Sequence, residues 1–283
     1  MSSEGSEAGR FPLTLRTRGI RLSGRLKLGA VYLVIAIVCV MLAADFGFDT
    51  HFMAEWAPFL LQGVPLTIFI SVVSILLAIP LALVGALGRL SSNPLFQGPA
   101  NFYVSFVRGT PLIVQIFFIY FGLPQLAFAP STPEWVRPAL VLSIVTSGII
   151  ALGVNYGAYM TEIFRAGIQS VGHGQIEAAH ALGMSGSQTM RRVVLPQAVR
   201  FVIPPVGNEF IAMLKDSALV GIAGTHELFF RASTIGRQFA HGFETFAVAA
   251  LIYWILTTIF SFFQKRAERR LARGYVRGQP HGH

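Results

Sequence analysis

Six apolar stretches, each about as long as a membrane-crossing helix, constrain this chain more than any other feature of its sequence. The hydrocarbon core of a bilayer is about 30 Å thick, so a helix needs about 20 predominantly apolar residues to cross it. The stretches lie at about residues 28–44, 58–87, 103–126, 136–164, 196–214 and 243–263. The sequence therefore predicts an all-α polytopic membrane protein with about six transmembrane helices.

The composition supports this class and excludes several others. The chain is 53% hydrophobic and 12% charged, whereas soluble domains carry about 25% charged residues. Its net charge of +9 flanks the apolar stretches instead of covering one soluble face, so we expect no nucleic-acid partner. The sequence has no P-loop, no Ser/His/Asp pattern and no cluster at metal-ligand spacing, and its single cysteine, Cys39, has no disulfide partner. We therefore expect no catalytic residue, metal or cofactor.

The distribution of positive charge predicts the orientation. With six spans, eighteen of the Lys and Arg residues fall in the tails at residues 1–27 and 265–283 or in segments on the same side, and only four fall on the other side. Loops rich in Lys and Arg stay in the cytoplasm, so both termini are expected there. The first apolar stretch exceeds the 7–15 residues of a signal peptide. We interpret residues 28–45 as an uncleaved additional helix.

The stretch "GHGQIEAAHALGMSGSQTMRRVVLP", residues 172–196, is small, polar and basic between two apolar spans. It predicts a short helix that ends at Gly183, a second helix capped by Ser185 or Ser187, and a new span starting at Pro196. A loop of this length is usually functional or disordered. The residues alone leave two interpretations open, a solvated connector or a knob seated in a cleft of a second protein.

The same stretch resembles the EAA signature of permease subunits in bacterial ABC importers. That pattern has E-A-A, three residues, G, nine residues and I-x-L-P, and here "EAAHALG" and "VVLP" fit it with Val193 in place of Ile. The segments "FVRGTPLIVQIFFIYFGLP", "GAYMTEIFRAGIQSV" and "PPVGNEFIAMLKDSAL" are similar to the polar amino-acid uptake branch. The resemblance covers about residues 59–264. It implies a five-helix permease domain at residues 58–264, to which the helix at 28–45 is an addition.

The resemblance also implies a function and a set of partners. The chain would be the membrane-spanning permease subunit of an ATP-driven amino-acid importer in the bacterial cytoplasmic membrane, without enzymatic activity of its own. The coupling loop at 172–195 would dock onto a dimer of separate ATP-binding subunits. A second permease chain, the same or related, and an extracytoplasmic solute-binding protein that delivers a polar amino acid would complete the system. The residues carried over for docking are Glu177, Ala178, Ala179 and Gly183.

An ion-gradient-driven secondary transporter is the alternative. Such transporters are built from inverted repeats with discontinuous helices around a coupling-ion site. We find no internal repeat in the sequence, and the 172–195 loop would have no purpose in that class.

Polar residues at membrane depth mark a candidate substrate pathway, because such groups are costly there and usually face a cavity or another helix. In the fifth span, Asn208 and Lys215 share one helical stripe, and Glu209 and Asp216 share the next. Lys215 is expected to meet a substrate carboxylate, and Glu209 or Asp216 the ammonium. The fourth span contributes Asn155 and Tyr159. The alternative is that these groups pair with one another or lie in interfacial water.

Other polar residues have expected structural roles. Arg108, Gly109, Thr110 and Pro111 predict a corner where a helix begins, anchored by the arginine at the cytoplasmic face. Glu162 and Arg165 are expected to form an interfacial ion pair. The hydroxyls of Thr67, Ser71 and Ser74 lie on one stripe and are typical of helix packing.

Overall fold

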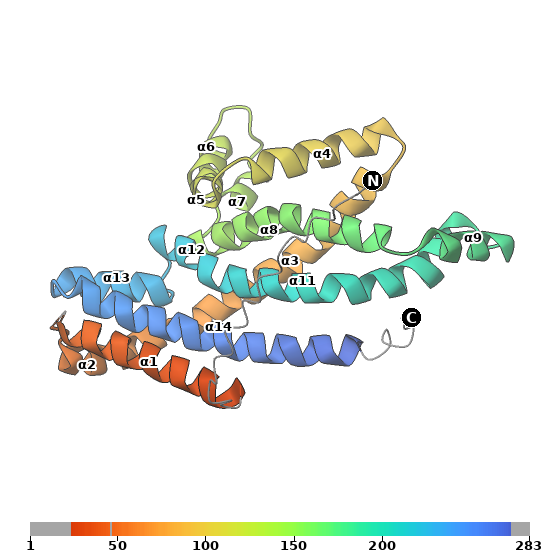
Figure 1. The fold of residues 1–283 in the computed structure, drawn as a ribbon. Helices are drawn as coiled ribbons and strands as arrows, with labels where there is room; N and C mark the ends of the chain where they lie inside the picture. The colour runs from red at the N-terminus through yellow and green to blue at the C-terminus, as the bar shows by residue number, and fades with distance from the viewer. Residues whose placement is uncertain (1–23, 46, 273–283) are drawn as a thin grey trace, which may run out of the picture. The chain divides into compact units, whose positions relative to one another are not determined.

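The computed structural model describes residues 24–45 and 47–272, and within them the regular structure is entirely helical (Figure 1). The chain divides into one unit that ends at Asp49 and a second that starts at Thr50. In the first unit, helix α1 (Gly24–Asp45) covers the predicted additional helix. Most of the tail at residues 1–27 and the last residues of the tail at 265–283 lie outside the described residues.

The second unit contains all the remaining helices. They are α2 (Thr50–Leu61), α3 (Val64–Leu90), α4 (Pro94–Arg108), α5 (Leu112–Phe117), the π-helical turn η1 (Phe118–Gly122), α6 (Leu123–Ala127), α7 (Arg137–Leu140), α8 (Ile144–Gln169), α9 (His173–Ala181), α10 (Gly186–Thr189), the π-helical turn η2 (Met190–Val194), α11 (Leu195–Asp216), α12 (Ala218–Ile222), α13 (Leu228–Gln238) and α14 (Gly242–Ala272). Helix α9 projects at one end of this unit, and α2 and α13 lie at the other end (Figure 1).

Helices α3 and α8 pack closely and form the centre of the second unit. Gly153 and Gly157 stand four residues apart on α8, the small-xxx-small spacing that lets membrane helices approach. A Cβ atom on Gly153 would lie 2.6 Å from Leu77 Cδ2, and one on Gly157 would lie 2.7 Å from the Tyr103 hydroxyl. Any larger side chain at these two positions would push α3 and α4 away from α8.

Three described helices, α3, α8 and α14, are each long and apolar enough to cross a membrane. A fourth candidate span is the pair formed by α4 and the α5–α6 segment, which is bent by 107°. Membrane crossing by the stretches at 28–44 and 196–214 stays a prediction from the sequence.

The predicted corner at Arg108–Pro111 is present, but it joins two helices within the third span instead of lying near the start of that span. Asn93 caps α4 by accepting a hydrogen bond from the Leu95 N–H at 3.0 Å, and Pro94 begins the helix. The third span therefore starts about nine residues before the predicted Tyr103, and Arg108 ends a 15-residue helix instead of beginning one. At 1.5 Å per residue, α4 carries Arg108 about 22 Å from the α3–α4 turn. The start predicted for this span is wrong, because Asn93 and Pro94 provide the cap and the first turn of α4, and the place of Arg108 at the cytoplasmic face stays a prediction.

One buried carboxylate joins three helices at the end opposite α9. Glu227 is fully buried and accepts hydrogen bonds from the hydroxyls of Thr67 at 3.2 Å and Tyr253 at 2.7 Å and from the Phe230 N–H at 2.8 Å. Burial raises the pKa of this carboxyl above its usual value, although these donors oppose the shift. Ser71 and Ser74 donate to carbonyls of Thr67 and Ile149. The packing role predicted for the three hydroxyls is confirmed.

Candidate functional site

The 172–195 loop folds as its sequence predicts. Helix α9 ends before Gly183, whose φ of +76° is a left-handed conformation that glycine adopts without strain. Ser185 caps α10 in a capping box, since its hydroxyl accepts the Gln188 N–H and the Gln188 side chain accepts the Ser185 N–H. Local backbone signals thus define both short helices, and Ser185 rather than Ser187 is the cap.

The side chains of this loop divide into an outward and an inward set. Glu177, Ala178 and Gly183 are exposed, whereas Ala179 is 4% exposed and packs against the chain itself. Leu182 is 83% exposed, which is unusual for a large apolar side chain in a polar segment. Within residues 47–272, Glu177 has no hydrogen bond or salt bridge. The outward set can meet a partner, and the sequence interpretation missed Leu182 although it adjoins Gly183 in the motif.

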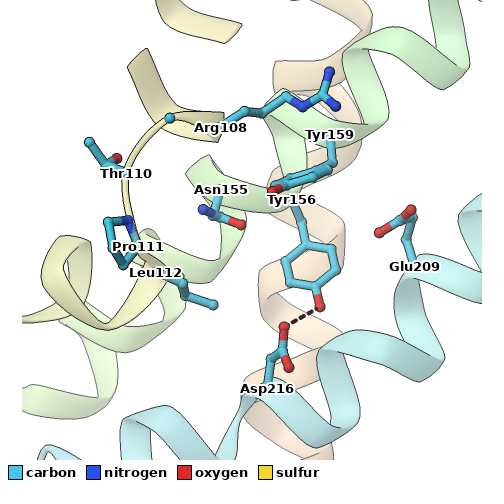
Figure 2. Close-up of a pocket in the computed structure, with 10 residues that line it drawn as sticks. Arg108, Thr110, Pro111, Leu112, Asn155, Tyr156, Tyr159, Glu209 and Asp216 are labelled. Carbon is cyan, nitrogen blue, oxygen red and sulfur yellow. Dashed lines mark hydrogen bonds between the residues drawn. The ribbon is translucent and has the colours of Figure 1, made fainter. Parts of the chain in front are cut away.

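A cavity of about 530 Å³, here called the first cavity, lies where the α4–α5 corner meets α8 and α11 (Figure 2). Its lining residues are Arg108, Gly109, Thr110, Pro111, Leu112, Asn155, Tyr156, Tyr159, Glu209 and Asp216. Asn155, Tyr159, Glu209 and Asp216, four of the residues predicted to line a substrate pathway, are therefore brought together here. The structure adds Arg108 and Tyr156, which the sequence interpretation did not assign to the pathway.

Polar contacts hold the walls of this cavity in place. The Tyr156 hydroxyl donates to Asp216 Oδ2 at 2.7 Å and so joins α8 to α11 (Figure 2). The Asn155 amide donates to Gln115 Oε1 at 3.2 Å, and the Gln115 amide donates to the Val107 carbonyl at 2.8 Å. Gln115 thereby ties the corner to α8. Among the residues described, Glu209 has no hydrogen bond or salt bridge, and it lines the cavity.

The charges of the first cavity are separated in space. Arg108 extends from the corner over the Tyr159 ring, with its guanidinium carbon 4.9 Å from the ring centroid. Glu209 and Asp216 lie on α11, two turns apart on one face (Figure 2). One wall therefore offers a cation and another wall offers carboxylates. A small molecule that carries both a carboxylate and an ammonium group matches this arrangement.

Two of the predicted pathway residues lie outside this cavity. Asn208 is exposed and accepts a hydrogen bond from the Gln264 amide of α14 at 2.9 Å. Lys215 is exposed and does not line the cavity. The stripe of Glu209 and Asp216 faces α8, so the neighbouring stripe of Asn208 and Lys215 points away from the cavity. The cation in the cavity is Arg108, to which the sequence interpretation gave a structural role.

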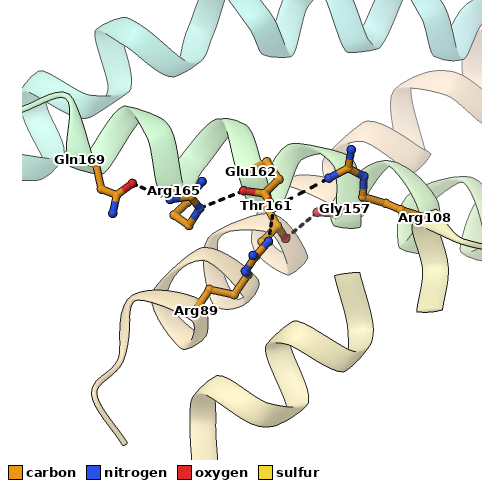
Figure 3. Close-up of polar contacts among 7 residues, drawn as sticks. All are labelled: Arg89, Arg108, Gly157, Thr161, Glu162, Arg165 and Gln169. Atoms are coloured by element: carbon orange, nitrogen blue, oxygen red, sulfur yellow. Dashed lines mark hydrogen bonds and ion pairs between the residues drawn. The ribbon is translucent and has the colours of Figure 1, made fainter. Parts of the chain in front are cut away.

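A cluster of charges surrounds Glu162 of α8 (Figure 3). Glu162 pairs with Arg89 of α3, with Arg165 Nε at 2.9 Å and with Arg108 Nη1 at 3.8 Å. The predicted Glu162–Arg165 pair is confirmed, and tertiary packing adds two further arginines to it. One carboxylate thus serves three cations, an arrangement that leaves excess positive charge.

Comparison with known proteins places this geometry in a family. Residues 74–273 match the family described as "Binding-protein-dependent transport system inner membrane component". The probable amino-acid permease protein YxeN of Bacillus subtilis (strain 168) is 38% identical over 231 residues, which is 80% of this chain and 97% of YxeN. The crystal structure of an amino acid ABC transporter with histidines contains a chain 36% identical to this one, with a TM-score of 0.70 over 79% of this chain and 99% of that chain.

A more distant structure supports the fold alone. The MetNI methionine ABC transporter in an inward-facing conformation has a chain that is 21% identical, with a TM-score of 0.61 over 75% of this chain and 96% of that chain.

The family match and the similarity to YxeN and to the 36% identical chain favour the ATP-driven importer over the ion-gradient alternative. ATP hydrolysis in such importers belongs to a separate chain. This chain belongs to the binding-protein-dependent inner membrane components, the permease subunits of ABC importers.

Proposed function

We propose that this chain forms the translocation pathway for a polar amino acid and that the solute passes through the first cavity. The names of its relatives support the substrate class, since YxeN is a probable amino-acid permease and the 36% identical chain comes from an amino acid ABC transporter. The observation that carries the proposal is the placement of Arg108 on one wall and of Glu209 and Asp216 on another.

An amino acid at neutral pH has a carboxylate and an ammonium group joined through one carbon atom. Arg108 offers a planar donor fork suited to a carboxylate, and the two carboxylates on α11 offer acceptors for the ammonium. Charged groups at membrane depth are costly unless they pair or serve a pathway. Glu209 has no hydrogen bond or salt bridge among the residues described, so a ligand ammonium group would give its carboxylate a hydrogen bond that the fold does not supply.

The 172–195 loop is proposed to dock onto a dimer of ATP-binding subunits. Glu177 and Ala178 are exposed on α9, and Leu182 and Gly183 follow them on the outward surface. Glu177 is proposed to pair with a cation of the ATPase, and Leu182 to fill an apolar pocket beside it. Ala179 packs inward and stabilises the loop, so its contribution to docking is indirect.

The remaining assembly is proposed on the same basis. A second permease chain, the same or related, completes the pathway, and an extracytoplasmic solute-binding protein delivers the amino acid. Both termini lie in the cytoplasm of a bacterium, and the inner membrane holds the chain. Residues 58–264 form the permease domain, and the helix at residues 28–45 is an addition to it.

The substitution Glu177→Lys tests the docking proposal. Charge reversal at an exposed residue disrupts pairing with the ATPase but leaves the membrane part intact, so uptake is abolished while the protein still inserts. Uptake is measured with a mixture of radiolabelled proteinogenic amino acids in cells that lack the native permease, and insertion is measured by the amount of chain in membranes. The matched control is Ser187→Lys, an exposed change in the same loop. Normal uptake by the Glu177→Lys variant would contradict docking through this residue.

A further inference from the structure

A second cavity adjoins the first. Its volume is about 650 Å³, and its lining residues are Arg89, Asn101, Val104, Ser105, Arg108, Gly109, Tyr159 and Glu162. Arg108, Gly109 and Tyr159 line both cavities. Because Gly109 has no side chain, the wall between the cavities consists mainly of the side chains of Arg108 and Tyr159.

The two cavities follow one another along α8. Asn155 and Tyr156 line the first cavity, Tyr159 lines both, and Glu162 lines the second. Glu162 lies seven residues after Asn155, which is about 10 Å along a helix. Helix α8 continues through Gln169 into the 172–195 loop, and Arg89 lies in the last turn of α3. The second cavity is therefore on the side of the 172–195 loop.

The wall between the cavities is held by contacts that can be broken at low cost. The Arg108 guanidinium stacks on the Tyr159 ring at 4.9 Å from its centroid and lies 3.8 Å from Glu162. The Tyr159 side chain makes no hydrogen bond among the residues described, and the residue is 40% exposed. A stack of this kind is polar and partly open, unlike the 2.7 Å hydrogen bond from Tyr156 to Asp216. The two side chains can separate without unpacking the helices.

The cavities on either side of this wall differ in charge. The first cavity has two carboxylates, Glu209 and Asp216, against Arg108. The second cavity has Arg89 and Arg108 against the single carboxylate of Glu162. Arg108 belongs to both, so a carboxylate bound to it competes with Glu162 for the same guanidinium.

We propose that Arg108 and Tyr159 form an inner gate between the two cavities and that the second cavity is the vestibule through which the solute leaves toward the 172–195 loop. This inference rests on the proposal that the first cavity admits the transported amino acid. A bound solute carboxylate draws Arg108 away from Glu162 and off the Tyr159 ring, which opens the wall. The excess positive charge of the second cavity then favours passage with the carboxylate leading.

Cysteine accessibility tests the gate without knowledge of the solute. The chain has a single cysteine, so Cys39→Ala gives a cysteine-free background. Ser105→Cys places a thiol in the second cavity, and Leu112→Cys places a thiol in the first cavity. Neither substitution removes a side-chain hydrogen bond among the residues described. The impermeant thiol reagent MTSET is applied without ATP or solute to inside-out vesicles, which expose the face of the 172–195 loop, and the full chain is present with its partner subunits.

We expect the Ser105→Cys thiol to react faster than the Leu112→Cys thiol while the gate is intact. Adding Tyr159→Ala to Leu112→Cys should raise its labelling rate about tenfold, which is the equilibrium shift expected from loss of one cation–π contact. Adding Tyr159→Phe should leave the rate unchanged, because the ring remains. Arg108→Gln removes the other half of the wall and should act like Tyr159→Ala.

Two results would overturn the gate. One is a Leu112→Cys thiol that reacts as fast as the Ser105→Cys thiol with Tyr159 present. The other is a slow Leu112→Cys rate that neither Tyr159→Ala nor Arg108→Gln increases, in variants that remain monodisperse in detergent. Failure of the proposed function is distinguishable, because it appears as absent amino-acid uptake with the labelling pattern unchanged.

Discussion

The 172–195 loop and the first cavity are built in opposite ways. The loop is one continuous segment whose shape depends on Gly183 and Ser185, and its Glu177 and Leu182 side chains are exposed. The cavity gathers residues from Arg108 to Asp216, and its side chains bond within the fold, Tyr156 to Asp216 and Asn155 to Gln115. In the loop, the residues that define the shape differ from those proposed to bind a partner. In the cavity, a residue such as Asp216 is proposed to bind the solute and also bonds within the fold.

This difference predicts how substitutions behave. A change on the outward surface of the loop should weaken a partner interaction without changing the stability of the chain. A change in the cavity should alter both transport and stability wherever the side chain bonds within the fold. Glu209 is the exception in the cavity, because it is the carboxylate there that has no hydrogen bond or salt bridge among the residues described.

The largest effect is expected for the two carboxylates of α11. Glu209→Gln and Asp216→Asn should each lower amino-acid uptake by about 10- to 100-fold, since a hydrogen bond to a charged group contributes about 1.5–3 kcal/mol. Only Asp216→Asn should also lower the thermal stability of the purified protein, by about 1 kcal/mol, because it weakens the contact with Tyr156. Uptake and thermal unfolding in detergent are measured on the same preparations. Equal losses of stability in both variants would erase the distinction between a free and a bonded carboxylate.

A smaller effect is expected for Leu182→Glu in the loop. Burial of an exposed leucine in a partner contributes about 1.5–3 kcal/mol, so affinity for the ATPase subunit should fall by about tenfold or more. Because Leu182 is 83% exposed, the stability of the isolated chain should change by less than about 0.5 kcal/mol. Affinity is measured by titration of the detergent-solubilised permease with the ATPase subunit, with Ser187→Glu as the control. Unchanged affinity would remove Leu182 from the docking surface.

The smallest effect is expected for Gly183→Ala, which probes loop shape alone. A Cβ atom there would meet nothing within 4 Å, so the cost comes from the φ of +76° and amounts to about 1 kcal/mol. Gly186→Ala is the matched control, since it also meets nothing within 4 Å but lies in the first turn of α10. Amide hydrogen exchange of residues 173–189 should accelerate in the Gly183→Ala variant only. Equal exchange in both variants would show that the left-handed turn does not stabilise the loop.

Features that depend on neighbours in the chain could be predicted from the sequence. The helical class follows from the apolar stretches, and the end of α9 follows from Gly183. A cap at Ser185 or Ser187, of which the structure selects Ser185, and the Glu162–Arg165 pair, three residues apart on α8, are equally local. Each rests on backbone or side-chain contacts within about one helical turn, whose geometry is the same in every helix.

Features that depend on the rotation of one helix against another required the tertiary structure. Helix α4 begins at Pro94 and ends at Arg108, and this arginine lines the first cavity. The stripe of Glu209 and Asp216, rather than that of Lys215, faces α8, and Ala179 turns inward. The sequence by itself determined the helices, the loop and the polar residues available to them. Packing decided which of those residues meet. Close contacts between helices, such as Gly157 of α8 against Tyr103 of α4, constrain how the helices are rotated against one another, and no local signal in the sequence encodes that rotation.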